Sequence, residues 1–195
     1  SSGRDAATGD GGPEQVMLDV SKLAAGHEFY SIGAQAVSPN SKLLAYTEDA
    51  VGRRQYSLRF KNLETGQTLP DRIENVQSQI AWAADNRTVI YVERDPVTLL
   101  GRRVRKHLLG ADPASDPIVY EEADTSFYLN VDKTKDDRYL YIHARSTVSS
   151  EMRVADAHDP DLAFRIFLPR ERDHEYQAEH LGNRWIIRTN WQAKN

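Results

Sequence analysis

The residues of this chain best suited to acid–base chemistry are two His-Glu pairs, His27-Glu28 and His174-Glu175. An imidazole beside a carboxylate can take up and release a proton near neutral pH. Each pair is followed by an aromatic residue and then by a segment expected to form a strand. The pairs therefore also suit a structural role, a hydrogen bond that fixes the start of a repeated unit. This simpler interpretation is favoured.

Three charged runs are candidate binding surfaces. The acidic run 121–124 (EEAD) could attract a basic substrate, although such a run more often forms a solvated connection between structural units. The basic runs 53–54 (RR) and 102–106 (RRVRK) could bind an anion. On strand edges, however, such charges usually prevent pairing with another chain. We therefore expect structural roles for all three runs.

The sequence contains no complete catalytic or metal-binding motif. The nucleophile elbow G-x-S-x-G, a glycine-rich phosphate loop, an H-x-x-x-H pair and cysteine are all absent from it. Asp156, Asp159 and Asp161 are spaced like part of a calcium loop, but the required glycine and distal glutamate are missing. The sequence thus predicts no catalytic, cofactor-binding or metal-ligating residue.

The composition indicates a soluble globular protein. Apolar residues make up 39% and charged residues 28% of the 195 positions, with a formal net charge of −4. An acidic balance argues against nucleic acid as a partner, because phosphate binding favours a basic surface. No apolar run is long enough to span a membrane. The lack of cysteine fits a reducing compartment, and we expect a cytoplasmic protein without a cofactor.

A repeated pattern shows which elements must position these residues. Four stretches consist of a turn of small polar residues, one basic residue and an apolar strand; the basic residues are Lys42, Arg87, Arg138 and Arg184. Their separations are 45, 51 and 46 residues. A period in the forties, with strands and without helices, is typical of β-propeller blades. The fold class predicted is all-β.

The turns divide the chain into four-stranded antiparallel blades. The second strand of each blade is almost continuously apolar, which predicts burial on both faces. We expect Trp82, Trp185 and Trp191 in the core, because they lie in or beside inner strands. Residues 14–20 are expected to form the outer strand of an incomplete blade, and 21–26 a turn or helical cap. The other expected strands are 33–38, 43–49, 56–63 and 67–73; 79–83, 88–94, 102–109 and 117–121; 126–131, 139–144, 150–155 and 164–168; and 176–181 and 185–190.

The chain is expected to hold only part of a ring. Residues 14–195 provide about three and a half blades, whereas propellers have typically four to eight. Residues 1–13 are expected to be a flexible loop or the cut end of a longer chain. Open blade faces would make the isolated piece prone to aggregation.

The particular amino acids within and around the repeats resemble those of a known family. The strings HEFYSIGAQAVSPNSKLLAYTED, RRQYSLRFKNLETG, DPVTLLGRRVRKHLLG, SEMRV, FLPRERDHEY and TNWQAKN are similar to the oligopeptidase B group of the prolyl oligopeptidase family. The resemblance covers about residues 14–195. It implies a seven-bladed N-terminal propeller and a C-terminal α/β-hydrolase domain with a Ser-Asp-His triad, which cleaves short peptides after Arg or Lys.

The resemblance assigns this chain to the propeller alone. Its implied partners are the hydrolase domain of the same protein and short basic peptides, and the implied role is a gate that keeps folded proteins from the triad. No catalytic residue of the family falls on a position of this chain, so the chain alone is expected to be inactive. The alternative is a propeller that is not an enzyme and serves as a protein-interaction or binding scaffold.

Overall fold

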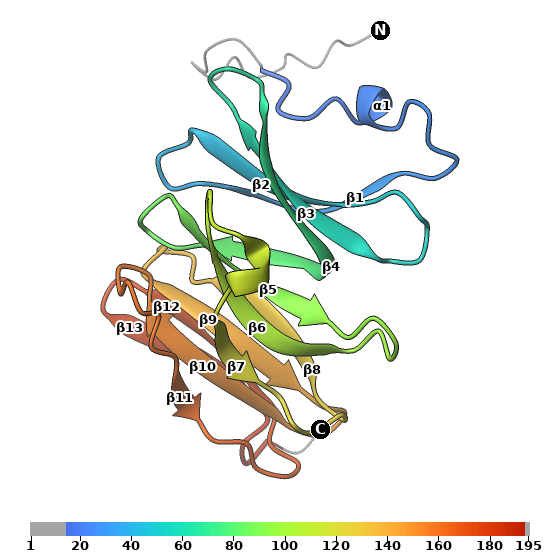
Figure 1. Ribbon diagram of the computed structural model, residues 1–195. Helices are drawn as coiled ribbons and strands as arrows, with labels where there is room; N and C mark the ends of the chain where they lie inside the picture. Colours follow the sequence, from blue (N-terminus) through green and yellow to red (C-terminus); the bar gives the residue numbers. More distant parts are fainter. Residues whose placement is uncertain (1–14, 194–195) are drawn as a thin grey trace, which may run out of the picture.

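The computed structural model describes residues 15–193, and these residues form an almost entirely β structure (Figure 1). The expected loop at 1–13 lies outside the described residues. The one α-helix among the described residues, α1 (Val20–Leu23), is capped by the Asp19 carboxylate, which accepts a hydrogen bond from the Lys22 N–H. The expected cap within 21–26 is therefore confirmed, whereas the expected strand at 14–20 is wrong for its described residues.

The strands follow one another as antiparallel blades stacked from the N-terminal to the C-terminal end (Figure 1). Most expected boundaries agree with the structure to within two residues. The strands are β1 (Ser31–Val37), β2 (Leu43–Asp49), β3 (Tyr56–Asn62), β4 (Thr68–Trp82), β5 (Thr88–Arg94), β6 (Gly101–Leu108), β7 (Ile118–Glu121), β8 (Tyr128–Lys133), β9 (Tyr139–Arg145), β10 (Ser150–Asp156), β11 (Arg165–Leu168), β12 (Tyr176–Leu181) and β13 (Arg184–Thr189).

Strand β4 belongs to two blades. The expected strands 67–73 and 79–83 are one continuous strand, so the first two blades share a sheet of seven strands, β1 to β7. Val76 is the junction, because it pairs with Tyr56 of β3 on one side and with Glu93 of β5 on the other. The third blade is a separate sheet, β8 to β11, and β12 and β13 form a hairpin that begins a fourth.

The repeated turns are held by short polar side chains. Ser41, Asn86 and Asp137, each directly before the repeated basic residue, have positive φ angles of 61°, 60° and 60°. Asn and Asp tolerate this left-handed conformation better than most residues. In the second turn Asp85 accepts hydrogen bonds from the backbone N–H of residues 87 and 88 at 2.9 and 2.8 Å. These local bonds explain why the turns could be recognised in the sequence.

The hydrophobic core consists of clusters between successive blades. Trp82 is fully enclosed between the first two blades, where it packs edge-to-face on Phe60 and donates a hydrogen bond to the Ala36 carbonyl at 2.8 Å. Further clusters lie between the second and third blades and between the third blade and the hairpin. Strands β2, β5 and β9 are buried as expected, whereas β13 is mostly exposed, because one of its faces meets no described strand.

Gly33 marks a close approach between the first two blades. A Cβ at this position would lie 2.5 Å from Thr47 Oγ1, 2.9 Å from Ser78 Cβ and 2.9 Å from Tyr56 Cε1. We expect Gly33→Ala to lower the free energy of unfolding by about 2 kcal/mol, the usual cost of overpacking. Urea denaturation measures this loss, with Gln35→Ala on the same strand as the control. A Gly33→Ala protein as stable as the control would contradict this account.

Candidate functional site

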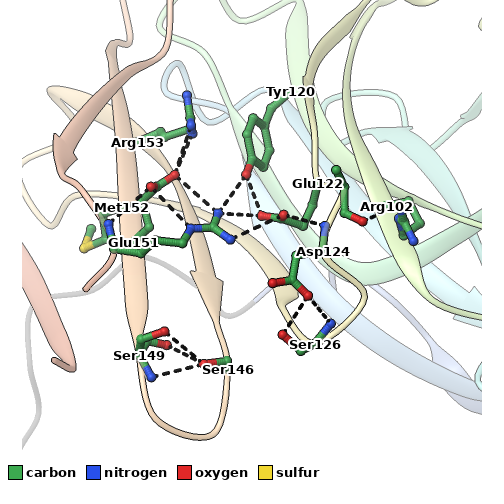
Figure 2. A network of polar contacts seen from close by, with 12 residues as sticks. Arg102, Tyr120, Glu122, Asp124, Ser126, Ser146, Ser149, Glu151, Met152 and Arg153 are labelled. Carbon is green, nitrogen blue, oxygen red and sulfur yellow. Dashed lines mark hydrogen bonds and ion pairs between the residues drawn. The ribbon is translucent and has the colours of Figure 1, made fainter. Parts of the chain in front are cut away.

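The side chain of Arg170 joins the second blade to the third through ion pairs with Glu122 and Glu151, the two carboxylates labelled in Figure 2. Arg170 follows β11, and its guanidinium lies between Glu122, just after β7, and Glu151 of β10. Its Nη2 is 2.7 Å from Glu122 Oε2, and its Nε is 3.4 Å from Glu151 Oε2. The guanidinium also lies over the Phe127 ring, 3.9 Å from its centroid. One cation therefore connects two blades and the loop that leads to the hairpin.

Both carboxylates of this network are buried and fully engaged. Glu122 and Glu151 are each 4% exposed. The Tyr120 hydroxyl donates a hydrogen bond to Glu122 at 2.6 Å, and Arg153 donates one to Glu151 at 3.0 Å. Two arginines thus balance two glutamates. Buried charges are tolerated only when they are paired and hydrogen-bonded in this way.

The network keeps Glu122 ionised. Burial alone would raise the pKa of Glu122, but hydrogen bonds from Arg170, Tyr120 and the backbone N–H of Asp124 outweigh burial, so its pKa is lowered. Burial and the hydrogen bond to Glu122 raise the pKa of Tyr120. A carboxylate held ionised by a guanidinium is a poor proton shuttle at neutral pH. The arrangement therefore serves to fix blade positions rather than to transfer protons.

The residues of the acidic run 121–124 differ in burial, so the expected solvated connection holds for only part of the run. Glu121 is exposed and pairs with Arg103 at 3.0 Å, as expected for a solvated connection. The expectation is wrong for Glu122, whose buried carboxylate binds Arg170. Asp124 accepts hydrogen bonds from the backbone and hydroxyl of Ser126 and so shapes the turn before β8.

The basic runs do not lie on sheet edges. The run 102–106 belongs to β6, which is paired on both sides by β5 and β7, so the expected protection of an edge is wrong. Arg103 and Arg105 of this strand both reach Glu93, at 3.7 and 2.9 Å. Residues 53–54 lie in the loop between β2 and β3. Cross-strand ion pairing replaces the edge role in β6.

The two His-Glu pairs have different surroundings. His174 fixes the start of the hairpin: its Nε2 is 2.9 Å from Thr189 Oγ1, and the Glu175 N–H donates to Asn190 Oδ1 at 2.9 Å. His27 and Glu28 are exposed, and the ring of His27 packs 5.5 Å from that of Tyr30. The structural interpretation therefore fits the second pair. The structure brings neither pair together with the other.

The remaining candidates are mostly structural. In the loop after β10, Asp159 accepts hydrogen bonds from the backbone N–H of Asp161 and Ala163, both at 3.0 Å. Trp185 packs 4.6 Å from Phe167 between ring centroids, in line with a core position. Trp191 is 56% exposed, so a core position is wrong for it.

No local pattern in the sequence points to the central residues of the network. Arg170 lies 48 residues from Glu122 and 19 residues from Glu151, so no local spacing connects them. The same holds for a second buried group: His107 Nε2 is 3.1 Å from Asp71, and its Nδ1 is 2.9 Å from Asp116, after the 3-10 helix η1 (Pro113–Ser115).

Comparison with known proteins gives a consistent result. Residues 2–195 match the family described as prolyl oligopeptidase, N-terminal beta-propeller domain. Dipeptidyl aminopeptidase BI of Pseudoxanthomonas mexicana is 51% identical over 184 residues, 94% of this chain and 25% of that protein. Protease 2 of Moraxella lacunata is 29% identical over 188 residues, 93% of this chain and 26% of that protein.

Solved structures show the same likeness to peptidases of this family. Oligopeptidase B from Leishmania major superposes with a TM-score of 0.86 and 28% identity, over 95% of this chain and 26% of that one. The chain thus spans about a quarter of the length of the relatives that it matches. Within residues 15–193, no helix has the length and apolar composition needed to cross a membrane. Both the sequence match and the arrangement of blades lead to one conclusion: the chain belongs to the prolyl oligopeptidase family and corresponds to part of its N-terminal β-propeller domain.

Proposed function

We propose that these blades are the substrate-filtering part of a serine peptidase. The catalytic Ser-Asp-His triad would lie in an α/β-hydrolase domain of the same protein, and that domain would be the direct partner of the propeller. The observation that carries the proposal is the match of residues 2–195 to a peptidase propeller. The relatives named above, all peptidases, disfavour the alternative of a scaffold without enzymatic activity.

The inner strands provide a surface that suits filtering. A cavity of about 410 Å³ lies between β1, the end of β4 and β8. Gln35, Gln79 and Asp132 give it polar walls. An extended peptide can exchange hydrogen bonds with such walls, whereas a folded protein is far larger than a cavity of about 410 Å³. Separation of the active site from bulk water would be a further effect of the closed propeller.

Two substrate preferences follow from the relatives. The resemblance of the repeats to the oligopeptidase B group implies cleavage of short peptides after Arg or Lys, and the structural likeness to oligopeptidase B from Leishmania major keeps this as the first candidate. The 51% identity to a protein named dipeptidyl aminopeptidase BI favours a second candidate, the release of dipeptides from a free N-terminus. We place the whole protein in the cytoplasm, in keeping with a chain that has no cysteine.

Reporter peptides test the proposal on the full-length protein. We expect kcat/KM to be at least about tenfold higher for a short blocked peptide with Arg at the cleaved position than for its Ala counterpart. The same Arg sequence inside a folded protein should not be cleaved. If only peptides with a free N-terminus are cleaved, two residues at a time, the second candidate is correct.

The 195-residue chain by itself is expected to give no turnover with the same reporters. Activity that survives further purification would show that the active site does not lie outside this chain. A full-length protein that cleaves none of the reporters would favour the scaffold.

A further inference from the structure

A polar cavity of about 330 Å³ lies between the third blade and the hairpin, apart from the Arg170 network. Two of its lining residues, Arg145 and Ser150, flank the turn between β9 and β10 where Ser146 and Ser149 lie (Figure 2). The walls come from the end of β9, the start of β10 and both strands of the hairpin. The lining residues that matter here are His143, Arg145, Glu175, Gln177, Arg188 and Asn190.

One buried polar atom in the wall of the cavity, Nε2 of His143, has no partner among the described residues. His143 is 6% exposed, and its Nε2 makes no hydrogen bond with any described residue. Burial and the nearby guanidinium of Arg145 lower the pKa of His143 to about 4, so the ring is neutral at pH 7. Asn130, which pairs with His143 across β8 and β9, also has a buried Oδ1 without a partner among the described residues. Unpaired buried polar groups are rare and point to a ligand or water.

The rim of the cavity carries excess positive charge. Arg145 Nη2 is 4.0 Å from Glu175 Oε2, the outer limit of an ion pair. Arg188 donates a hydrogen bond to Gln177 Oε1 at 3.2 Å. Each guanidinium has five N–H donors, so both arginines retain donors for a ligand. With His143 neutral, two arginines face one glutamate, and the local charge is positive.

We propose that this cavity binds the terminal carboxylate of a short peptide. A guanidinium matches a carboxylate with two parallel hydrogen bonds, and two guanidinium groups here flank a buried imidazole. The side-chain NH₂ group of Gln177 can donate to the peptide carbonyl that precedes the carboxylate. That the carboxylate belongs to a peptide rests on the proposed peptidase function; the anion-binding chemistry rests on the cavity alone.

Binding should be coupled to a proton. A carboxylate beside His143 stabilises the imidazolium and raises its pKa, and the complex therefore takes up a proton. The other charged groups that line the cavity are Arg145, Arg188 and Glu175. We expect affinity to increase severalfold as the pH falls from 8 to 5.5, a range in which the peptide carboxylate stays ionised.

Calorimetric titration of the full-length protein with N-acetyl-Ala-Ala tests the proposal. The free acid should bind at least about tenfold more tightly than its C-terminal amide, because the amide lacks the charge that the arginines recognise. The double variant Arg145→Gln/Arg188→Gln should lose this preference. Arg184→Gln, which removes the same charge at the other end of β13, is the control and should bind like wild type.

Three results would overturn the proposal: equal binding of acid and amide, tighter binding of inorganic phosphate than of the acid, or an unchanged affinity in the double variant. Using the full-length protein ensures that poor folding of the 195-residue chain does not decide the result. The titration needs no turnover. A failure of the peptidase assays would therefore leave a measured carboxylate site in place. A failure of carboxylate binding would likewise leave a positive peptidase assay in place.

Discussion

Replacing Arg170 by methionine (Arg170→Met) should lower the free energy of unfolding by about 3 kcal/mol at pH 7. The substitution removes the cation that faces Glu122 and Glu151, whose side chains are only 5% exposed. Two buried carboxylates would then be left with Arg153 as their remaining cation. Methionine keeps much of the length and apolar contact of arginine, so the loss reports mainly the charge. Urea denaturation followed by circular dichroism measures it.

The pH dependence of this loss identifies its cause. In the wild type the lowered pKa of Glu122 contributes stability above its ordinary value near 4.5, and this contribution is lost as the pH falls through the folded-state pKa. Without Arg170, burial raises the pKa of the Glu122 carboxyl, and protonation removes the unpaired buried charge. The difference between Arg170→Met and wild type should therefore be largest at neutral pH and shrink towards pH 4.

Two further variants separate charge from packing. Arg172→Met alters a neighbouring arginine whose side chain is 90% exposed, and its stability should equal that of wild type. Adding Glu122→Gln and Glu151→Gln to Arg170→Met should restore much of the lost stability, because no buried carboxylate remains unpaired and the charge left over, Arg153, has a side chain that is 25% exposed to solvent. If the triple variant is less stable than Arg170→Met alone, the network does not act through its charges.

Replacing His107 by leucine (His107→Leu) should cost about 3 kcal/mol at pH 6. His107 is fully buried, and each ring nitrogen faces a carboxylate, Asp71 from β4 and Asp116 beyond η1. Both nitrogens can donate to these acceptors only in the protonated ring. Leucine would leave two buried carboxylates facing an apolar side chain across the junction of the first two blades.

The sign of the pH dependence follows from the two shifted groups. Burial alone would lower the pKa of His107, but hydrogen bonds to Asp116 and Asp71 outweigh it and raise the pKa above 6.5. This stabilisation is complete below pH 6.5 and is lost as the pH rises through the folded-state value. Burial would raise the pKa of Asp71, but hydrogen bonds from the Gly110 N–H and His107 lower it below 3.8. That contribution is lost in acid.

The difference in stability between wild type and His107→Leu should therefore have a maximum between about pH 4 and pH 6.5. Denaturation curves at pH 3, 5.5 and 9 would show it. His158→Leu, at a histidine whose side chain is 76% exposed, is the matched control and should show little pH-dependent change. A difference that is constant across pH would mean that His107 contributes by packing alone.

The architecture could be read from the sequence because its signals are local. Turn residues such as Asp85 bond to backbone groups two and three positions away, and the apolar run of each second strand lies within seven residues. The union of 67–73 and 79–83 into β4 could not be read in this way. It depends on pairing with β3 on one side and β5 on the other, which no single stretch encodes.

The sequence by itself thus determined the all-β class, the blade period and the family resemblance, because these depend on neighbours in the chain. Only the tertiary structure decided which charged residues are buried together. Glu122 reads as part of a solvated acidic run, yet blade stacking brings it to Arg170, 48 residues away. His107 and His143 likewise acquire their environments from adjacent blades. Burial is a property of the stacked blades, and it turns ordinary surface residue types into paired or unpaired interior groups.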